Sequence, residues 1–154
     1  MKKFVYIICF LSGIQSSFAQ LNLRKFEEID SLQQSERRKV IVFIHTDWCK
    51  YCQAFQSKTL KNEAIIKLLN EKFYFIDLNA EEKHTISFNN QIFEFKPTGI
   101  NSTIHDLAIQ LGTINGKINY PNLCFLNESN EIIFQHDGFL NTKDFKLLLE
   151  KTLN

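Results

Sequence analysis

Hydrophobic and polar positions along the first half of the chain form patterns that predict two helices and two strands. Residues 23–38 (LRKFEEIDSLQQSERR) repeat an apolar side chain every third position with charges between, which is typical of an amphipathic helix. The continuous apolar and β-branched run at 39–45 (KVIVFIH) predicts a strand covered on both faces. Residues 53–72 have helical spacing without glycine or proline, and 73–79 (FYFIDLN) indicate a second buried strand. A helix that connects two strands of one sheet implies parallel pairing with a right-handed crossover.

The pattern changes after the second strand, where shorter runs predict a hairpin and another helix. Residues 84–95 (HTISFNNQIFEF) contain two alternating runs on either side of Asn89 and Asn90, which indicates a small β-hairpin. Ser102 is suited to cap a helix over residues 103–111.

The C-terminal part predicts two adjacent strands and a last helix. Residues 120–126 (YPNLCFL) indicate a strand with a proline near its start, and 131–136 (EIIFQH) are expected to pair back on it. Asn141 is suited to cap the final helix, whose buried stripe is Phe145, Leu148 and Leu149. The whole pattern predicts an α/β fold with a central mixed sheet flanked by helices.

Two cysteines three positions apart, Cys49 and Cys52, stand where the first strand ends and a helix begins. Sites collect at this edge of open α/β sheets. Free N–H groups at the helix start favour a thiolate at Cys49, and only a thiolate attacks a disulfide. Cys52 lies one turn further on the same helix face. We therefore expect Cys49 to attack and Cys52 to resolve the mixed disulfide.

Two other interpretations of the pair are weaker. A zinc site needs four ligands, and the pair supplies two, so we expect no metal. A structural disulfide across so short a loop would stabilise little by restricting the unfolded chain. The third cysteine of the domain, Cys124, lies in an apolar run and is expected to be a buried, inert thiol.

The first 19 residues predict a signal peptide rather than part of the fold. Two lysines precede an apolar segment that is too short to span a membrane, and small residues follow at a site that suits cleavage after Ala19. Cleavage would leave 135 of the 154 residues, one domain over 20–154, and change the formal charge from +1 to −1. We therefore expect a periplasmic or secreted protein without stable membrane insertion. The chain has no basic stripe that would indicate nucleic acid.

Residues 22–153 resemble the thioredoxin superfamily. The shared features are a strand that runs into W-C-x-x-C at a helix start and, downstream, an X-Pro strand with a hairpin partner and a last helix. The stretch FEEIDSLQQSERRKVIVFIHTDWCKYC is most similar to exported thioredoxin-like proteins of bacteria. Residues 80–101, with the predicted hairpin, are longer than in a minimal thioredoxin and are expected to form an insertion.

The resemblance implies roles for residues around the cysteines. The family's proline at the place of Pro121 is cis and faces the cysteine pair, so that the backbone of Tyr120 is free to pair with a substrate strand. Trp48 would cover the exposed sulfur and form part of the docking surface.

The chain departs from the family pattern beside the buried thiol. Thioredoxins carry an acid six residues before the first cysteine, and this chain has Phe43 there. Asp77, where the family often has a lysine, is our candidate for the proton traffic of Cys52, with a solvated strand-end residue as the alternative. His45 and Lys50 would lower the pKa of Cys49 and Asp47 would raise it, if their side chains face the sulfur.

The sequence therefore favours a thiol–disulfide oxidoreductase of the cell envelope that acts on protein disulfides or dithiols. We expect no cofactor other than the Cys49–Cys52 disulfide. The small size of the fold favours a reductase, which would receive electrons from a membrane-borne redox partner. The alternative is a non-catalytic binding or chaperone-like module, for which the Phe-rich segment 88–95 would supply the surface.

Overall fold

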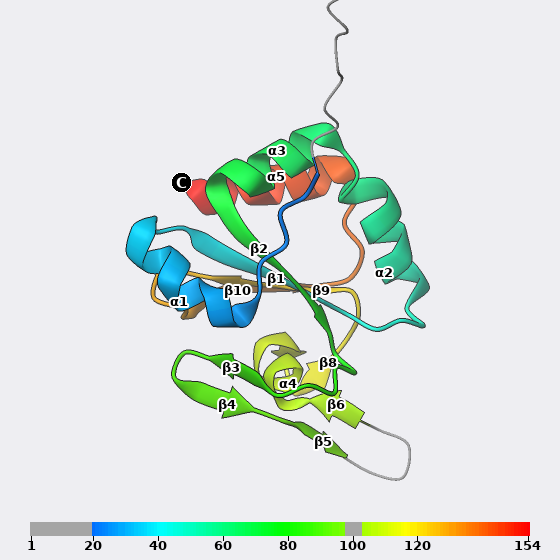
Figure 1. Ribbon diagram of the computed structural model, residues 1–154. Helices are drawn as coiled ribbons and strands as arrows, with labels where there is room; N and C mark the ends of the chain where they lie inside the picture. The colour runs from blue at the N-terminus through cyan, green and yellow to red at the C-terminus, as the bar shows by residue number, and fades with distance from the viewer. Residues whose placement is uncertain (1–19, 98–102) are drawn as a thin grey trace, which may run out of the picture.

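A computed structural model describes residues 20–97 and 103–154, so the predicted signal peptide at 1–19 lies outside the described residues (Figure 1). A four-stranded mixed sheet in the order β10-β9-β1-β2 forms the centre of the molecule. Its strands are β1 (Lys39–His45), β2 (Phe73–Asn79), β9 (Asn122–Leu126) and β10 (Ile132–Asp137). The first two strands are parallel and the other pairs are antiparallel, which confirms the predicted mixed sheet.

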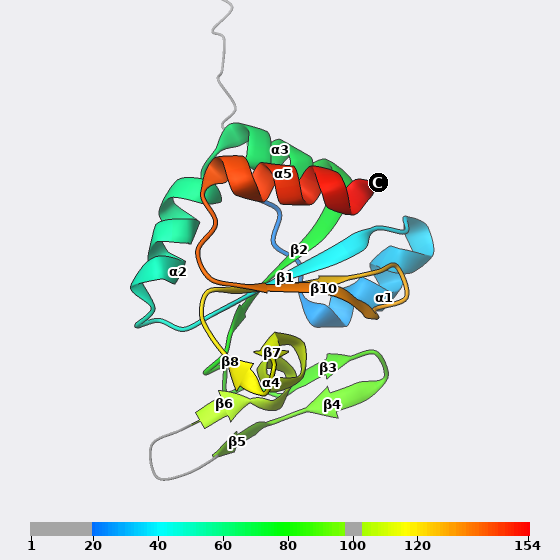
Figure 2. The same cartoon turned by 180° about the vertical axis from the view of Figure 1, so that it is seen from behind.

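Strand β1 is central because its apolar run can be buried on both faces. Residues 40–44 are all inaccessible to solvent, with alternate side chains entering two separate cores. One core lies under α2 (Lys50–Ala54), α3 (Glu63–Lys72) and α5 (Thr142–Leu153). The other lies under α1 (Phe26–Ser35), α4 (Asp106–Gly112) and the insertion. Figures 1 and 2 show these helices as layers on opposite faces of the sheet.

The prediction of one continuous helix over residues 53–72 is wrong. The segment contains the end of α2, the π-helix η1 (Phe55–Thr59) and then α3, which begins anew at Glu63. The side chain of Asn62 accepts hydrogen bonds from the backbone N–H groups of Ala64 and Ile65, so it caps α3 and separates the two helical segments. The apolar spacing continues through this break, and therefore periodicity alone predicted one helix.

The first helix is shorter than the predicted 23–38, because its first residues pair with the sheet. Leu23 forms a parallel bridge with Phe75, and the Arg24 N–H donates to the Phe75 carbonyl at 2.8 Å. Only residues from Phe26 to Ser35 are helical.

The insertion contains the predicted hairpin. Strands β3 (Ile86–Phe88) and β4 (Gln91–Phe93) are antiparallel, and Asn89 and Asn90 adopt positive φ angles of 52° and 59° in the turn. Phe88 and Phe93 are buried in the core next to α1. The hairpin phenylalanines therefore pack inward, against the surface role that the binding-module alternative gave them.

A second pair of short strands follows, β5 (Phe95–Pro97) and β6 (Thr103–His105). The predicted start of the next helix at residue 103 is wrong. Residues 103–105 form β6, and α4 begins only at Asp106. The Nδ1 atom of His105 accepts from the Leu107 N–H and caps α4, and the predicted cap Ser102 lies outside the described residues. Strands β7 (Thr113–Ile114) and β8 (Lys117–Ile118) then pair as a short antiparallel hairpin, which is followed by Tyr120 and Pro121.

The C-terminal elements agree with the sequence pattern except at one boundary. Strand β9 begins at Asn122, not at residue 120, and the Tyr120–Pro121 peptide bond that precedes it is cis. The Asn141 side chain accepts from the Asp144 N–H and caps α5 as predicted. Among the described helices, none is both long enough and apolar enough to cross a membrane.

Candidate functional site

The cysteine pair lies just beyond the C-terminal end of β1. A turn in which the Cys49 N–H donates to the Thr46 carbonyl folds the chain into α2, and Cys49 and Cys52 are joined by a disulfide. Cys49 is the N-cap of α2, and its sulfur accepts the backbone N–H of Cys52 at 3.1 Å. The same N–H is therefore in place to stabilise a thiolate on Cys49 after reduction.

The two sulfurs differ in access. Cys49 keeps 5% of its surface exposed, whereas Cys52 is completely buried among the residues of the α2–α3–α5 core. An external thiol or disulfide can therefore reach Cys49 first.

Aromatic side chains stand at the surface next to the cysteine motif. Trp48 and Tyr51 are 65% and 69% exposed, and the ring of Trp48 meets that of Tyr120 edge to face at 6.0 Å. The Trp48 indole N–H donates to Glu81 Oε1 at 3.1 Å. Sequence reasoning missed Glu81. Its position just after β2 could have indicated a role at the site, because parallel pairing brings that end of β2 beside the end of β1.

The loop before β9 completes this surface. Pro121 is buried, and its carbonyl accepts the Gly138 N–H. Tyr120 packs against both cores, and burial, together with the charge of Glu81, raises the pKa of its hydroxyl to about 12. The structure thus brings together Trp48 and Tyr120, two of the residues predicted for substrate docking.

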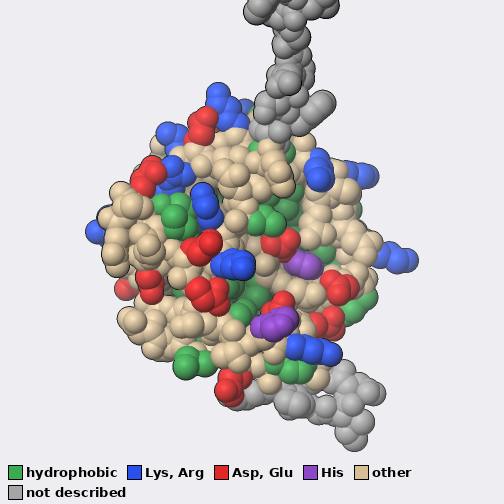
Figure 3. Space-filling model, in the orientation of Figure 1, with side chains coloured by type: hydrophobic (Ala, Val, Ile, Leu, Met, Phe, Trp, Pro, Cys, Tyr) green, Lys and Arg blue, Asp and Glu red, His purple; other side chains and the backbone are tan. Residues whose placement is uncertain are grey.

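His45 and Asp77 form an ion pair that the sequence did not predict. The Nε2 atom of His45 lies 2.7 Å from Asp77 Oδ1. The His45 side chain is mostly buried, whereas Asp77 is an exposed residue of β2. Burial acts to lower the pKa of His45, but the hydrogen bond and the charge of Asp77 outweigh it, so the pKa is raised. Figure 3 shows histidine side chains beside acidic ones on the face where β2 ends.

Phe43 fills the position where the resembling family carries an acid. Its side chain is completely buried, with its ring 5.2 Å from that of His45 and 5.1 Å from that of Phe55. Asp77 is the in-register partner of Phe43 on β2, so a carboxylate is present on the same face of the sheet but one strand further out.

The remaining predicted residues lie at the rim. The side chain of Asp47 accepts from Asn79 Nδ2 at 3.0 Å and its backbone carbonyl accepts from Gln53, so Asp47 ties the motif to the end of β2. Lys50 is exposed at the first position of α2. Within residues 20–97 and 103–154, no group of three His, Cys, Asp or Glu side chains is arranged to hold a metal.

Cys124 is separated from the redox pair by the sheet. It is a free, buried thiol on β9 and belongs to the α1–α4 core, whereas Cys49 and Cys52 belong to the other core. Burial raises its pKa to about 12.

Comparison with protein families matches residues 26–153 to the thioredoxin-like domain, and the chain belongs to this family. Three similar solved structures are the DsbH oxidoreductase, a thioredoxin from Thermus thermophilus and the C-terminal domain of Neisseria meningitidis DsbD in its reduced form. Their TM-scores are 0.63, 0.60 and 0.53, at 13%, 18% and 16% identity. The alignments cover 93%, 86% and 81% of this chain and 92%, 87% and 90% of those chains. Such likeness shows the fold. A search of curated proteins finds no match.

Proposed function

We propose that the protein catalyses thiol–disulfide exchange with protein substrates in the cell envelope and acts as a reductase. The observation that carries this proposal is the disulfide at the start of α2, of which only Cys49 is accessible and receives a backbone N–H. The DsbH oxidoreductase among the similar folds supports the same chemistry.

The reaction begins with the reduced pair. The Cys49 thiolate attacks one sulfur of a substrate disulfide, that S–S bond breaks, and the departing substrate sulfur takes a proton from water. Cys52 then loses its proton and attacks the Cys49 sulfur of the mixed disulfide, which releases the second substrate thiolate. Two electrons pass to the substrate, and the Cys49–Cys52 disulfide forms without any other cofactor.

Trp48, Tyr120 and Pro121 form the docking surface in this proposal. The exposed indole of Trp48 meets the half-buried phenol of Tyr120, and Tyr120 packs against the core that contains Cys49 and Cys52. Lys50 adds positive charge near Cys49 and Asp47 adds negative charge, so they tune its thiolate in opposite directions.

The direction of electron flow rests on the size of the fold. The helices of the described residues are those of a small thioredoxin-like domain, and the insertion is made of short strands. A reductase in an oxidising compartment needs a membrane-borne electron donor. The charged and apolar N-terminal sequence supports the envelope location, as do the Dsb-type names among the similar folds.

Insulin reduction tests the activity. Reduced protein with excess dithiothreitol should accelerate the precipitation of insulin chains, and Cys49→Ser should abolish the acceleration. Cys124→Ser is the matched control and should keep the wild-type rate, since Cys124 lies in the opposite core. A wild-type protein that gives no acceleration would instead support the binding module.

A further inference from the structure

The His45–Asp77 ion pair lies on the same face of the sheet as the redox cysteines. His45 and Phe43 are two positions apart on β1 and therefore point to one face, and Asp77 is in register with Phe43. Phe43 packs in the core that holds Cys49 and Cys52, and the His45 ring stacks on Phe43. The turn from Thr46 to Cys49 also brings the motif back over this end of β1.

The order of the strands places the histidine nearer than the carboxylate to the loop that precedes β9. β1 lies between β2 and β9, and β9 follows the Tyr120–Pro121 loop that touches Trp48. Asp77 is one strand further from that loop than His45 is. His45 is therefore the member of the pair on the strand next to β9, and Asp77 is the member on the edge strand.

Charged groups from the motif and from two surface cavities lie near this pair. The hydrogen bond and charge of Asp77 raise the pKa of His45, and the charge of Asp47 in the motif raises it further, so both acids favour the imidazolium. Asp77 also lines two surface cavities. Their charged members are Arg24, Lys25, Glu27, Glu82 and His84 in one cavity and Lys61 in the other. The outer side of Asp77 thus faces mixed charges, whereas the inner side of His45 faces the aromatic core.

We propose that the imidazolium of His45, held by Asp77, is the counter-charge of the thiolate that forms when the Cys49–Cys52 disulfide is reduced. Two electrons from a dithiol donor break the S–S bond, one sulfur takes a proton as a thiol, and the other stays a thiolate beside the imidazolium. The inference rests on the proposed thiol–disulfide exchange and names the residues that tune it. The pair takes the place of the acid that Phe43 excludes.

Coupling of this kind has a measurable size. Two unit charges about 4 Å apart change each other's pKa by about 0.7 units in water and about 3 units at an effective dielectric constant of about 20, and the shift falls in inverse proportion to their separation. Linkage makes the effect reciprocal, so the thiolate raises the pKa of the histidine by as much as the imidazolium lowers that of the thiol.

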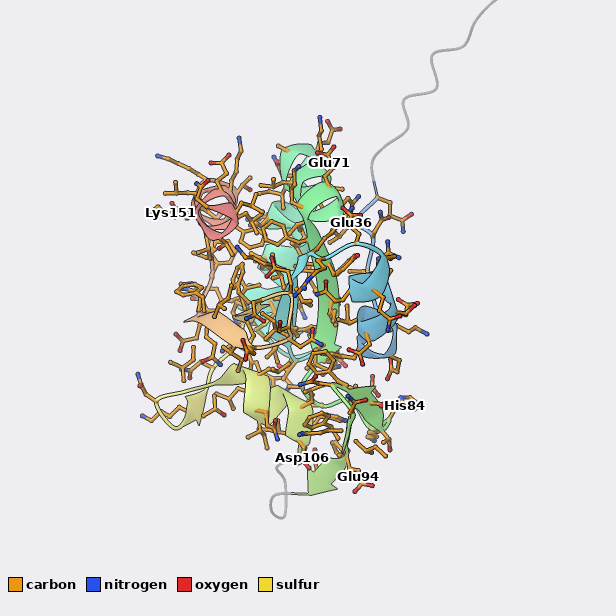
Figure 4. All side chains as sticks on the ribbon, turned by 90° about the vertical axis from the view of Figure 1, so that its left-hand side faces the viewer. Glu36, Glu71, His84, Glu94, Asp106 and Lys151 are labelled. Carbon is orange, nitrogen blue, oxygen red and sulfur yellow. A yellow bond between two sulfur atoms is a disulfide. The ribbon has the colours of Figure 1, made fainter. Side chains whose placement is uncertain are left out.

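NMR titration of the histidine ring protons in oxidised and in dithiothreitol-reduced protein tests the proposal. We expect the pKa of His45 to rise by about half a unit or more on reduction, at a pH range where Cys49 is ionised. His84 is the internal control. It also pairs with a carboxylate, Glu82 at 2.6 Å, but its side chain is 90% exposed in the insertion (Figure 4), so its titration curve should be the same in both states. Identical His45 curves in the two states would overturn the proposal.

The reciprocal measurement uses the rate at which iodoacetamide alkylates Cys49. In His45→Gln the midpoint of the pH–rate profile should move upward by the amount seen in the histidine titration, whereas His84→Gln should keep the wild-type midpoint. An unmoved midpoint in His45→Gln would contradict the coupling. These readouts need no substrate protein, so failure of the insulin assay with a shifted His45 titration would reject the proposed function alone.

Discussion

Replacement of Phe43 by leucine should destabilise the protein by about 1–3 kcal/mol, because two ring contacts worth about 0.5–1.5 kcal/mol each are lost. Phe43 is completely buried on the central strand, with ring neighbours His45 and Phe55 at 5.2 and 5.1 Å. A leucine keeps the position apolar and fills most of the volume, so the loss isolates the aromatic packing. For a domain of this size, the change corresponds to a decrease of about 4–11 °C in Tm.

Urea unfolding of the oxidised protein, followed by far-UV circular dichroism, measures this loss. Phe139→Leu is the matched control, because Phe139 is 40% exposed and its replacement should change the unfolding free energy by less than about 0.5 kcal/mol. If Phe43→Leu lowers the unfolding free energy by no more than Phe139→Leu does, the aromatic contacts of Phe43 do not stabilise the fold as expected.

Phe43→Asp extends the test to the departure from the family. The new carboxylate would be buried in an apolar core opposite Asp77, its in-register neighbour, so we expect a loss of several kcal/mol rather than a gain in activity. A stable, more active Phe43→Asp protein would show that the acid position is still usable.

Three further predictions concern the rim, the spare thiol and the ion pair. Glu81→Ala removes the acceptor of the indole N–H of Trp48, so the fluorescence emission of this single tryptophan should shift. Glu81→Gln can still accept the hydrogen bond and should keep the wild-type emission. Equal spectra for the two variants would contradict the expectation. Iodoacetamide at about pH 8 should leave Cys124 unlabelled in the folded, reduced protein and label it in urea, because burial raises the pKa of its thiol to about 12. Mass spectrometry reads the labelling. A folded protein labelled at Cys124 would contradict this prediction. The raised pKa of His45 means that the ion pair stabilises the fold fully below about pH 6.5 and loses this contribution as pH rises through the pKa of the folded state. The difference in unfolding free energy between wild type and Asp77→Asn should therefore shrink with rising pH, and a constant difference would count against the pairing.

The sequence predicted the sheet and the site motif because both depend on local patterns. Residues 40–44 are all apolar, which is typical of a central strand covered on both faces, and the cysteines follow shortly after that strand. The turn at Asn89 and Asn90 was predictable for the same reason, since asparagine tolerates the positive φ angles of a tight hairpin.

Features that depend on tertiary contacts could not be predicted in this way. The break before α3 coincides with Thr59, whose hydroxyl donates to the Leu140 carbonyl, 81 positions away in the chain. The His45–Asp77 pair depends on the register between two strands. In the same way, Leu23 continues the apolar spacing of the first helix but pairs with Phe75 instead.

The most direct test of the proposed reductase is the reduction potential of the Cys49–Cys52 pair, measured by equilibration with glutathione redox buffers and monitored by the fluorescence of Trp48. Known members of the fold span roughly 150 mV, from about −270 mV for thioredoxin to about −120 mV for the strong oxidant DsbA. A reductase should give a value near the thioredoxin end, at which the pair donates electrons to substrate disulfides. A value near the oxidant end would contradict the direction of electron flow, and a pair that does not equilibrate with glutathione would contradict the exchange itself.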